Sequence, residues 1–224
     1  MNTVTKEADM QDFTEVTGIV LKQMPVGESD RRVTILTNTI GKISAFAYGA
    51  RKPNSRFSAA TCPLAFGKFK LFAAGDSYRI AEADIQNFFE EFRTDLEGSF
   101  YASYFAEIAD YYCRENNDEG DMMKLFYQSL RALCKDSIPN PLVRAVYELR
   151  SIGVNGEYPG PPGDMALSES AVYTLEFIQK TPIKSLYTFS VTENVLEELK
   201  KVSGEYCKKY MDHSFKSLSI LESY

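Results

Sequence analysis

The sequence predicts an α+β fold in which a small five-stranded β-barrel is followed by an all-helical domain. Polar and apolar residues alternate between residues 17 and 81, and turn residues interrupt the alternation every few positions, as in successive β-strands. From residue 84 onward apolar residues recur every three or four positions, as in amphipathic helices. We therefore expect a barrel over residues 13–83 and helices over residues 84–224, after a flexible extension over residues 1–12.

Short strands account for the first domain, because turn sequences separate them and no helical pattern intervenes. The expected strands are residues 17–22, 32–37, 42–48, 65–72 and 77–81. Strands this closely spaced favour a closed or nearly closed barrel of the OB type. Such barrels bind single-stranded nucleic acid by stacking bases on aromatic rings while cations follow the phosphates.

Two of the strands predict an outer face that is basic and aromatic. Side chains alternate between the two faces of a strand, so the apolar Ile43, Ala45 and Ala47 share one face. The opposite faces carry Lys42, Ser44, Phe46 and Tyr48 in the third strand and Phe66, Lys68, Lys70 and Phe72 in the fourth. A simpler interpretation stays open, in which the rings of Phe66, Phe69 and Phe72 fill the barrel and the lysines are merely solvated.

Positive charge is concentrated in the first domain, although the whole chain carries a formal net charge of −6. Between residues 31 and 79 there are nine Lys or Arg residues against one acid, Asp76, a local balance of +8. The remainder of the chain is correspondingly acidic. A local basic field of this kind attracts a polyanion, and its strength falls with salt.

With 224 residues the chain is long enough for two modest domains. No apolar run approaches the length that spans a membrane. The N-terminal residues lack the apolar segment of a signal peptide. We therefore expect a cytoplasmic protein with no membrane partner.

The four cysteines and the one histidine predict neither a metal site nor a thiol enzyme. Cys62, Cys113, Cys134 and Cys207 are far apart and form no C-x-x-C pair, and His213 follows Cys207 at a spacing that places the two on different faces of a helix. We expect small core cysteines and no cofactor. Because no nucleophile with a base and no glycine-rich phosphate loop is visible, we expect no enzyme.

Helical periodicity divides the second domain at the polar residues 115–120 and at the Pro- and Gly-rich residues 155–167. The apolar positions of the first two expected helices are Tyr101, Tyr104, Phe105, Ile108 and Tyr112, then Met123, Phe126, Leu130 and Leu133.

A third helix is expected to begin with Asn140 as its cap and to end at Gly153, with Arg144, Glu148 and Ser151 on the face opposite its apolar stripe. A last long helix is expected after residues 190–193, which fit a capping box.

Specific segments resemble the RecO family of bacterial recombination mediator proteins. Residues 19–57 (IVLKQMPVGESDRRVTILTNTIGKISAFAYGARKPNSRF) are similar to the family's opening pattern of a strand, a G-E-S-D type turn, a second strand, G-K and a G-A-R basic loop. Residues 90–97 (EEFRTDLE) and 101–104 (YASY) resemble the family's first helix, and residues 147–150 (YELR) its F-E-L-R helix. Many members place the cysteine pairs of a zinc ribbon after that helix, and this chain lacks them, so the resemblance carries over no metal site.

The resemblance implies an activity and partners. The implied activity is binding and annealing of single-stranded DNA and recognition of the C-terminal tail of the single-stranded DNA-binding protein. Together with RecR, a protein of this family helps to load RecA during repair. A protein-interaction adaptor, whose barrel binds a partner protein and does not contact DNA directly, is the alternative function.

The resemblance also implies DNA-contacting residues, namely Arg31, Arg32, Lys42, Arg51, Lys52 and Arg56. The strand faces add Lys68, Lys70 and Arg79 as cations, and the rings expected to stack on bases are Phe46, Tyr48 and Phe57. For the partner tail we expect Arg144 and Arg150 in the third helix. The alternative for Arg144 is an ion pair with Glu148 one helical turn later, and a spacing of six residues puts the two arginines on different faces.

Overall fold

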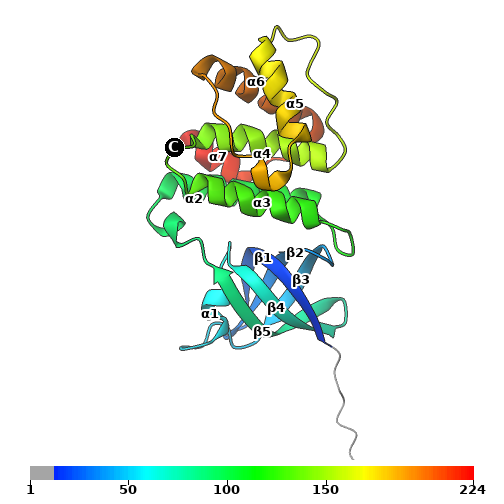
Figure 1. Cartoon of the computed structure of the whole chain (residues 1–224). Helices are drawn as coiled ribbons and strands as arrows, with labels where there is room; N and C mark the ends of the chain where they lie inside the picture. Colours follow the sequence, from blue (N-terminus) through cyan, green and yellow to red (C-terminus); the bar gives the residue numbers. More distant parts are fainter. Residues whose placement is uncertain (1–12) are drawn as a thin grey trace, which may run out of the picture.

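The computed structural model describes residues 13–224, so the extension expected over residues 1–12 lies outside the described residues. Five strands form a closed barrel in the order β1-β2-β3-β5-β4 (Figure 1). They are β1 (Phe13–Val26), β2 (Asp30–Thr37), β3 (Lys42–Ala47), β4 (Phe66–Ala74) and β5 (Ser77–Asn87), and the one-turn helix α1 (Phe57–Ala60) lies between β3 and β4. The expected OB-type barrel followed by helices is confirmed.

The barrel closes through one short parallel pairing. All other neighbouring strands are antiparallel, whereas β3 and β5 pair in parallel over Ala45 with Tyr78 and Phe46 with Arg79. We call this pairing the seam. Strand β1 reaches both β2 and β4 because it is fourteen residues long and its register shifts between Val20 and Lys22, as at a β-bulge that bends a strand.

Two strands are longer than the sequence indicated. Strand β1 extends four residues before and four residues after the expected residues 17–22, and β5 continues six residues beyond residue 81. The helical period expected from residue 84 therefore begins later. In this part of β5 the side chains of Ala83 and Ile85 still pack on the barrel core while Glu82 and Asp84 are exposed, which is the alternation of a strand.

The inward faces of the strands are those that the period of two predicts. Ile43, Ala45 and Phe69 are at most 1% exposed inside the barrel. Phe66 and Phe72 point outward instead. The ring of Phe66 packs against Tyr127 of the helical domain, with centroids 4.3 Å apart. Of the three phenylalanines that could have filled the barrel, only Phe69 does so.

The helical domain lies on one end of the barrel (Figure 1). Its elements are η1 (Glu90–Arg93), α2 (Leu96–Tyr112), α3 (Gly120–Leu133), α4 (Asn140–Val154), α5 (Glu169–Lys180), η2 (Ile183–Ser185), α6 (Glu193–Tyr210) and α7 (Lys216–Ser223). Helices α2 and α3 separate the barrel from α4, α5 and α6, and the loop expected over residues 155–167 connects α4 to α5. The short helix α7 packs beside α2 and was not expected from the sequence.

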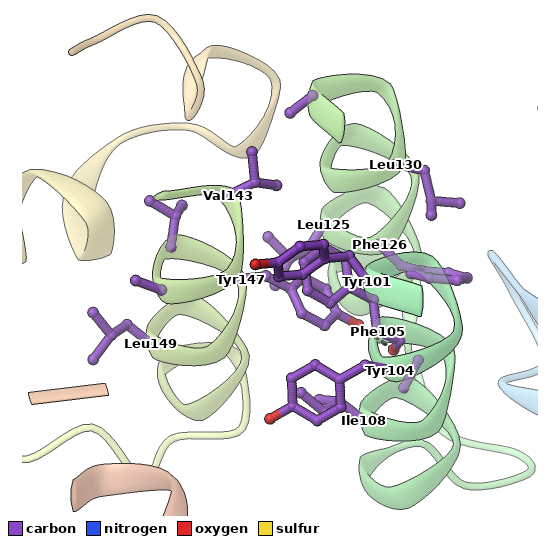
Figure 2. Packing of buried hydrophobic residues seen from close by; sticks show 14 of the residues in the cluster. Tyr101, Tyr104, Phe105, Ile108, Leu125, Phe126, Leu130, Val143, Tyr147 and Leu149 are labelled. Atoms are coloured by element: carbon purple, nitrogen blue, oxygen red, sulfur yellow. Dashed lines mark hydrogen bonds between the residues drawn. The ribbon is translucent and has the colours of Figure 1, made fainter. Parts of the chain in front are cut away.

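Aromatic side chains of α2, α3 and α4 form the centre of this domain (Figure 2). The rings of Phe105 and Tyr147 stack with centroids 4.2 Å apart, and Tyr104 and Phe126 are fully buried beside them. The tyrosine-rich stripes of the sequence are therefore core, as their helical spacing predicted.

Two of the three residues expected on the face of α4 opposite its apolar stripe are buried. Glu148 is 3% exposed and Ser151 is 0% exposed, because α2, α3, α5 and α6 all pack against α4. The buried carboxylate of Glu148 accepts hydrogen bonds from the Tyr104 hydroxyl and the Arg144 Nε, each at 2.8 Å, and one from the Ser203 hydroxyl. Such complete pairing is what makes a buried carboxylate tolerable.

Two helix boundaries also differ from expectation. Pro139, and not Asn140, is the cap of α4, which ends at Val154. Helix α6 begins at Glu193 with Thr192 as its cap and without a side-chain cap hydrogen bond, so the capping box expected over residues 190–193 does not form. The difference has a simple geometric reason, since Ser190 lies two residues too early to reach the first turn.

Three apolar side chains of the barrel and a backbone hydrogen bond connect it to the helical domain. The side chains of Ile19, Leu21 and Leu36, on strands β1 and β2, are buried in the core of the helical domain. The amide of Lys42 donates to the Arg114 carbonyl at 2.9 Å. The two domains are therefore held together by apolar packing and by backbone hydrogen bonds.

Candidate nucleic-acid interface

Cations and aromatic rings alternate across the outer face of the barrel. Arg32 on β2 pairs with Phe46 on β3, and its guanidinium carbon lies 5.8 Å from the centre of that ring. Phe46 in turn pairs with Arg79 across the seam, and the Arg79 guanidinium lies 5.1 Å from the ring centre of Phe72 on β4. The strand register thus aligns a cation, a ring, a second cation and a second ring across β2, β3, β5 and β4.

The line continues onto β1. Phe72 pairs with Phe13, and the Lys70 ammonium lies 4.0 Å from the centre of the Phe13 ring. On β3, the Phe46 ring is stacked with the ring of Tyr48, with centroids 6.3 Å apart and an interplanar angle of 13°. We call the set Arg32, Phe46, Arg79, Phe72, Lys70 and Phe13 the cation–aromatic row.

The cation–aromatic row has the chemistry of a single-strand platform. Phe13 is 52% and Tyr48 is 55% exposed, although large aromatic side chains normally leave water when a protein folds. Bases stack on rings or on guanidinium planes, and neighbouring cations contact phosphates. Both kinds of group occur side by side in this row.

Acidic neighbours neutralise part of the charge near this row. Lys68 lies 3.7 Å from a Glu15 carboxylate oxygen, and Lys70 lies 3.5 Å from one of Glu82. Exposed ion pairs of this kind contribute little, so a phosphate can replace the carboxylate at small cost.

The basic loop after β3 lies against the hairpin between β1 and β2. Arg51 donates from its side chain to the Gly27 carbonyl at 2.9 Å and from its backbone to Ser29 at 2.8 Å, while Lys52 is exposed. The Arg56 guanidinium carbon lies 4.7 Å from the ring centre of Phe57. Arg51, Lys52 and Arg56 therefore share one exposed loop.

Three of the residues expected to contact DNA, namely Phe57, Arg31 and Lys42, have other partners in the structure. Phe57 is 8% exposed and packs in the barrel core. Arg31 donates to the Ser58 carbonyl at 2.7 Å and to the Thr61 hydroxyl at 2.8 Å. These contacts attach the end of the basic loop to strand β2.

Lys42 faces the helical domain, where its ammonium lies 3.0 Å from an Asp110 carboxylate oxygen. Lys22 approaches the other carboxylate oxygen at 2.7 Å. Burial alone would raise the pKa of Asp110, but the hydrogen bonds from Lys22 and Lys42 outweigh it and hold that pKa below its usual value of 3.8. Lys42 therefore joins the barrel to α2.

The two arginines expected to bind a partner tail make internal contacts. Arg144 lies 2.8 Å from Glu148 and 3.2 Å from Glu222 of α7. Burial opposes its charge, but Glu148 outweighs burial and keeps the pKa of Arg144 above the usual value. Arg150 donates to the carbonyls of Ile178 and Gln179 at the end of α5, on a different face of α4.

Within residues 13–224, no three His, Cys, Asp or Glu side chains gather where they could hold a metal ion. Cys113 is buried, and Cys62, Cys134 and Cys207 are half-buried thiols. In the same part of the chain no helix is both long and apolar enough to cross a bilayer.

Several residues at this surface were not expected as site residues. Phe13 and Phe72 join the cation–aromatic row only through the pairing of β1 with β4. Lys22 and Arg114 line one groove only because the two domains are in contact. Strand register and domain contacts depend on residues far apart in the sequence. The period of two in one strand could therefore indicate only that Phe72 faces outward.

Two family models match the chain. The model described as recombination protein O N terminal matches residues 10–89, and the model described as recombination protein O C terminal matches residues 93–160 and 152–219. A DNA repair protein RecO from Acetivibrio thermocellus is 31% identical over an alignment that covers 95% of this chain and 97% of that relative. A RecO from Clostridium perfringens strain 13 is 27% identical over 92% of this chain and 96% of its own length. One from Bacillus subtilis strain 168 is 32% identical over 66% of this chain and 57% of its own length.

Proposed function

Because this chain belongs to the RecO family of DNA repair proteins, as its sequence motifs indicated, we propose that it is a mediator of homologous recombination that binds and anneals single-stranded DNA. With RecR as partner it helps to load RecA onto DNA covered by the single-stranded DNA-binding protein. It acts in the cytoplasm and by binding, without catalysing a reaction of its own.

The cation–aromatic row is the observation that supports DNA binding most directly. It crosses strands of the barrel and offers stacking surfaces and phosphate contacts side by side. A face that only kept the protein in solution would not need large exposed rings. Annealing also fits this surface, because an outer face leaves the edges of the bound bases accessible to a second strand.

The proposed DNA contacts are the cation–aromatic row and the basic loop, together with the neighbouring Tyr48 and Lys68. They are Arg32, Phe46, Tyr48, Arg51, Lys52, Arg56, Lys68, Lys70, Phe72, Arg79 and Phe13. Of these, Phe46, Lys70, Phe72 and Arg79 are half-buried and the others are exposed. Arg31, Lys42 and Phe57 act instead through the structure, by holding the basic loop, the domain contact and the barrel core.

A titration with labelled oligothymidylate at several salt concentrations tests this proposal. If roughly five phosphates are neutralised, the logarithm of affinity falls against the logarithm of salt with a slope near about −3.5. The double variant Phe46→Ala, Arg79→Gln should lose most of the affinity. The matched control Tyr173→Ala, Lys180→Gln removes an exposed ring and an exposed cation from α5 and should bind as the wild type does. Wild-type binding that is indifferent to salt would instead favour the protein-interaction adaptor.

Recognition of the tail of the single-stranded DNA-binding protein belongs to the same proposal. The helical domain offers Arg144 and Arg150 beside apolar side chains, and charge-assisted contacts to a carboxylate are strong. Because both arginines have internal partners, a tail that binds to Arg144 has to replace Glu222.

A further inference from the structure

A groove of about 480 Å³ lies between strands β1, β2 and β3 and the C-terminal end of α2 with the residues that follow it. We call it the junction groove. Its charged lining consists of Lys22, Arg32, Lys42, Arg114, Asp110 and Glu115. Four cations against two carboxylates leave an excess of positive charge, which favours an anionic ligand.

The internal ion pairs of the groove neutralise only some of these cations. Asp110 accepts from Lys22 at 2.7 Å and from Lys42 at 3.0 Å. Lys42 is 20% exposed, whereas Lys22 is 61% exposed and can leave its partner at little cost. Arg114 is exposed, and its Nη1 donates to the Cys113 carbonyl at 3.0 Å, which holds the guanidinium at the end of α2.

Arg32 connects the junction groove to the cation–aromatic row. Its guanidinium lies near the Phe46 ring, while its Nε donates to the Ser44 hydroxyl at 2.6 Å, and Ser44 also lines the groove. A strand that lies along the row and leaves it at Arg32 therefore enters the groove. Sites on OB-type barrels cover roughly 4–16 nucleotides, which is enough for both surfaces.

We propose that the junction groove binds backbone phosphates of the same single strand, with Lys22 and Arg114 as the contacts. A phosphate oxygen replaces the Asp110 carboxylate as the partner of Lys22, while Lys42 keeps Asp110 and the domain contact. This inference rests on the proposed DNA binding and extends it, because it makes the helical domain part of the DNA site.

The first test is the salt dependence of binding to an oligothymidylate of about 20 nucleotides, longer than one such site. The double variant Lys22→Gln, Arg114→Gln should reduce the slope by about 1.4, since each lost phosphate contact on a single strand removes about 0.7. The same loss lowers affinity about 25-fold at about 0.1 M salt, and the difference disappears toward about 1 M. Lys22→Gln alone should reduce the slope by about 0.7, half as much as the double variant. This single variant provides the test if the double variant fails to fold.

The matched control is Lys200→Gln, Lys208→Gln. These exposed lysines of α6 also pair with carboxylates, those of Glu197 and Glu205, and α2 and α3 separate helix α6 from the barrel (Figure 1). Their loss should leave the slope unchanged.

The second test uses the unmodified protein. Acetylation of lysine side chains, read by mass spectrometry, should become slower at Lys22 when the oligonucleotide is saturating and should not change at Lys200. Unchanged acetylation of Lys22, or a wild-type slope in the Lys22→Gln variant, would overturn the groove site. If the Phe46→Ala, Arg79→Gln variant loses binding in the same experiments, the proposed function stands without the groove. A wild-type protein that does not bind the oligonucleotide overturns both.

Discussion

A Cβ atom on Gly41 would overlap the backbone carbonyl oxygen of Arg114. The turn between β2 and β3 thus touches the end of α2 main chain to main chain. Gly41 also has a φ of +71°, a region that other residues rarely adopt. One residue therefore meets two demands, that of the turn and that of the domain contact.

Replacement of Gly41 by alanine should weaken the contact between the domains. The left-handed backbone costs a non-glycine residue roughly 1–2 kcal/mol. Overlap with Arg114 adds roughly 1–3 kcal/mol. Gly75→Ala is the control, because Gly75 has a φ of +63° but open space around its Cβ position. Chemical unfolding of both variants separates the two costs, and equal losses would show that the overlap is relieved without cost.

The Lys22–Asp110–Lys42 contact should be insensitive to pH until strongly acidic conditions. Since the folded pKa of Asp110 lies below its usual value of 3.8, its stabilisation is complete above that pH and disappears as the pH falls through the lower folded pKa. The difference in unfolding free energy between wild type and Asp110→Asn should stay constant from about pH 7 to about pH 4.5 and then shrink. Asp121→Asn, which removes a surface pair with Lys124, should have little effect at any pH. A difference that persists unchanged to about pH 2.5 would contradict this assignment.

Stacking and charge should separate in variants of the basic loop. Tyr48→Ala should lower the affinity for single strands by roughly 1–3 kcal/mol with little change in the salt slope, because stacking releases no counterions. Arg51→Glu with Lys52→Glu should lower affinity whatever the base sequence and reduce the slope by about 1.4. Measurement of both variants over one salt series distinguishes the two contributions. An Arg51→Glu, Lys52→Glu protein with the parental affinity would count against DNA contact by this loop.

Release of Arg144 should reveal whether it receives the partner tail. Glu222→Gln removes the exposed carboxylate 3.2 Å from Arg144 and leaves the buried pair with Glu148 intact. If the tail carboxylate takes this place, its affinity, measured with a tail peptide by calorimetry, should rise several-fold, since the tail no longer has to displace Glu222 and exposed ion pairs are worth up to about 1 kcal/mol. Glu176→Gln, at a surface pair on α5, is the control. Equal affinity in all three proteins would remove Arg144 from the tail site.

The sequence predicted which face of a strand points inward better than it predicted the partner of each charged side chain. Alternation alone indicated that Ile43 and Ala45 lie inside and that Phe46 lies outside. It could not distinguish Lys42, which binds Asp110, from Lys52, which is exposed, because both are lysines in a basic segment. That difference depends on where a helix more than sixty residues later lies.

The helices show the same division. The spacing of Tyr104 and Phe105 predicted burial on one side of α2, and the structure confirms it. The spacing placed Glu148 opposite the apolar stripe of α4, but Glu148 is buried because α6 brings Ser203 and α2 brings Tyr104 to its carboxylate. Periodicity reports on one helix at a time, so it cannot detect a polar group that is buried and fully paired.

The seam is the place where we expect the barrel to open most easily. Only two residue pairs join β3 to β5, so few backbone hydrogen bonds have to break there, and amide hydrogens near Ala45 and Tyr78 should exchange sooner than those of the other strand pairs. Phe46 and Arg79, on opposite sides of the seam, are also neighbours in the cation–aromatic row. A DNA strand bound across both residues would hold β3 and β5 together and oppose opening of the seam. Bound DNA should therefore slow the exchange of amide hydrogens near Ala45 and Tyr78.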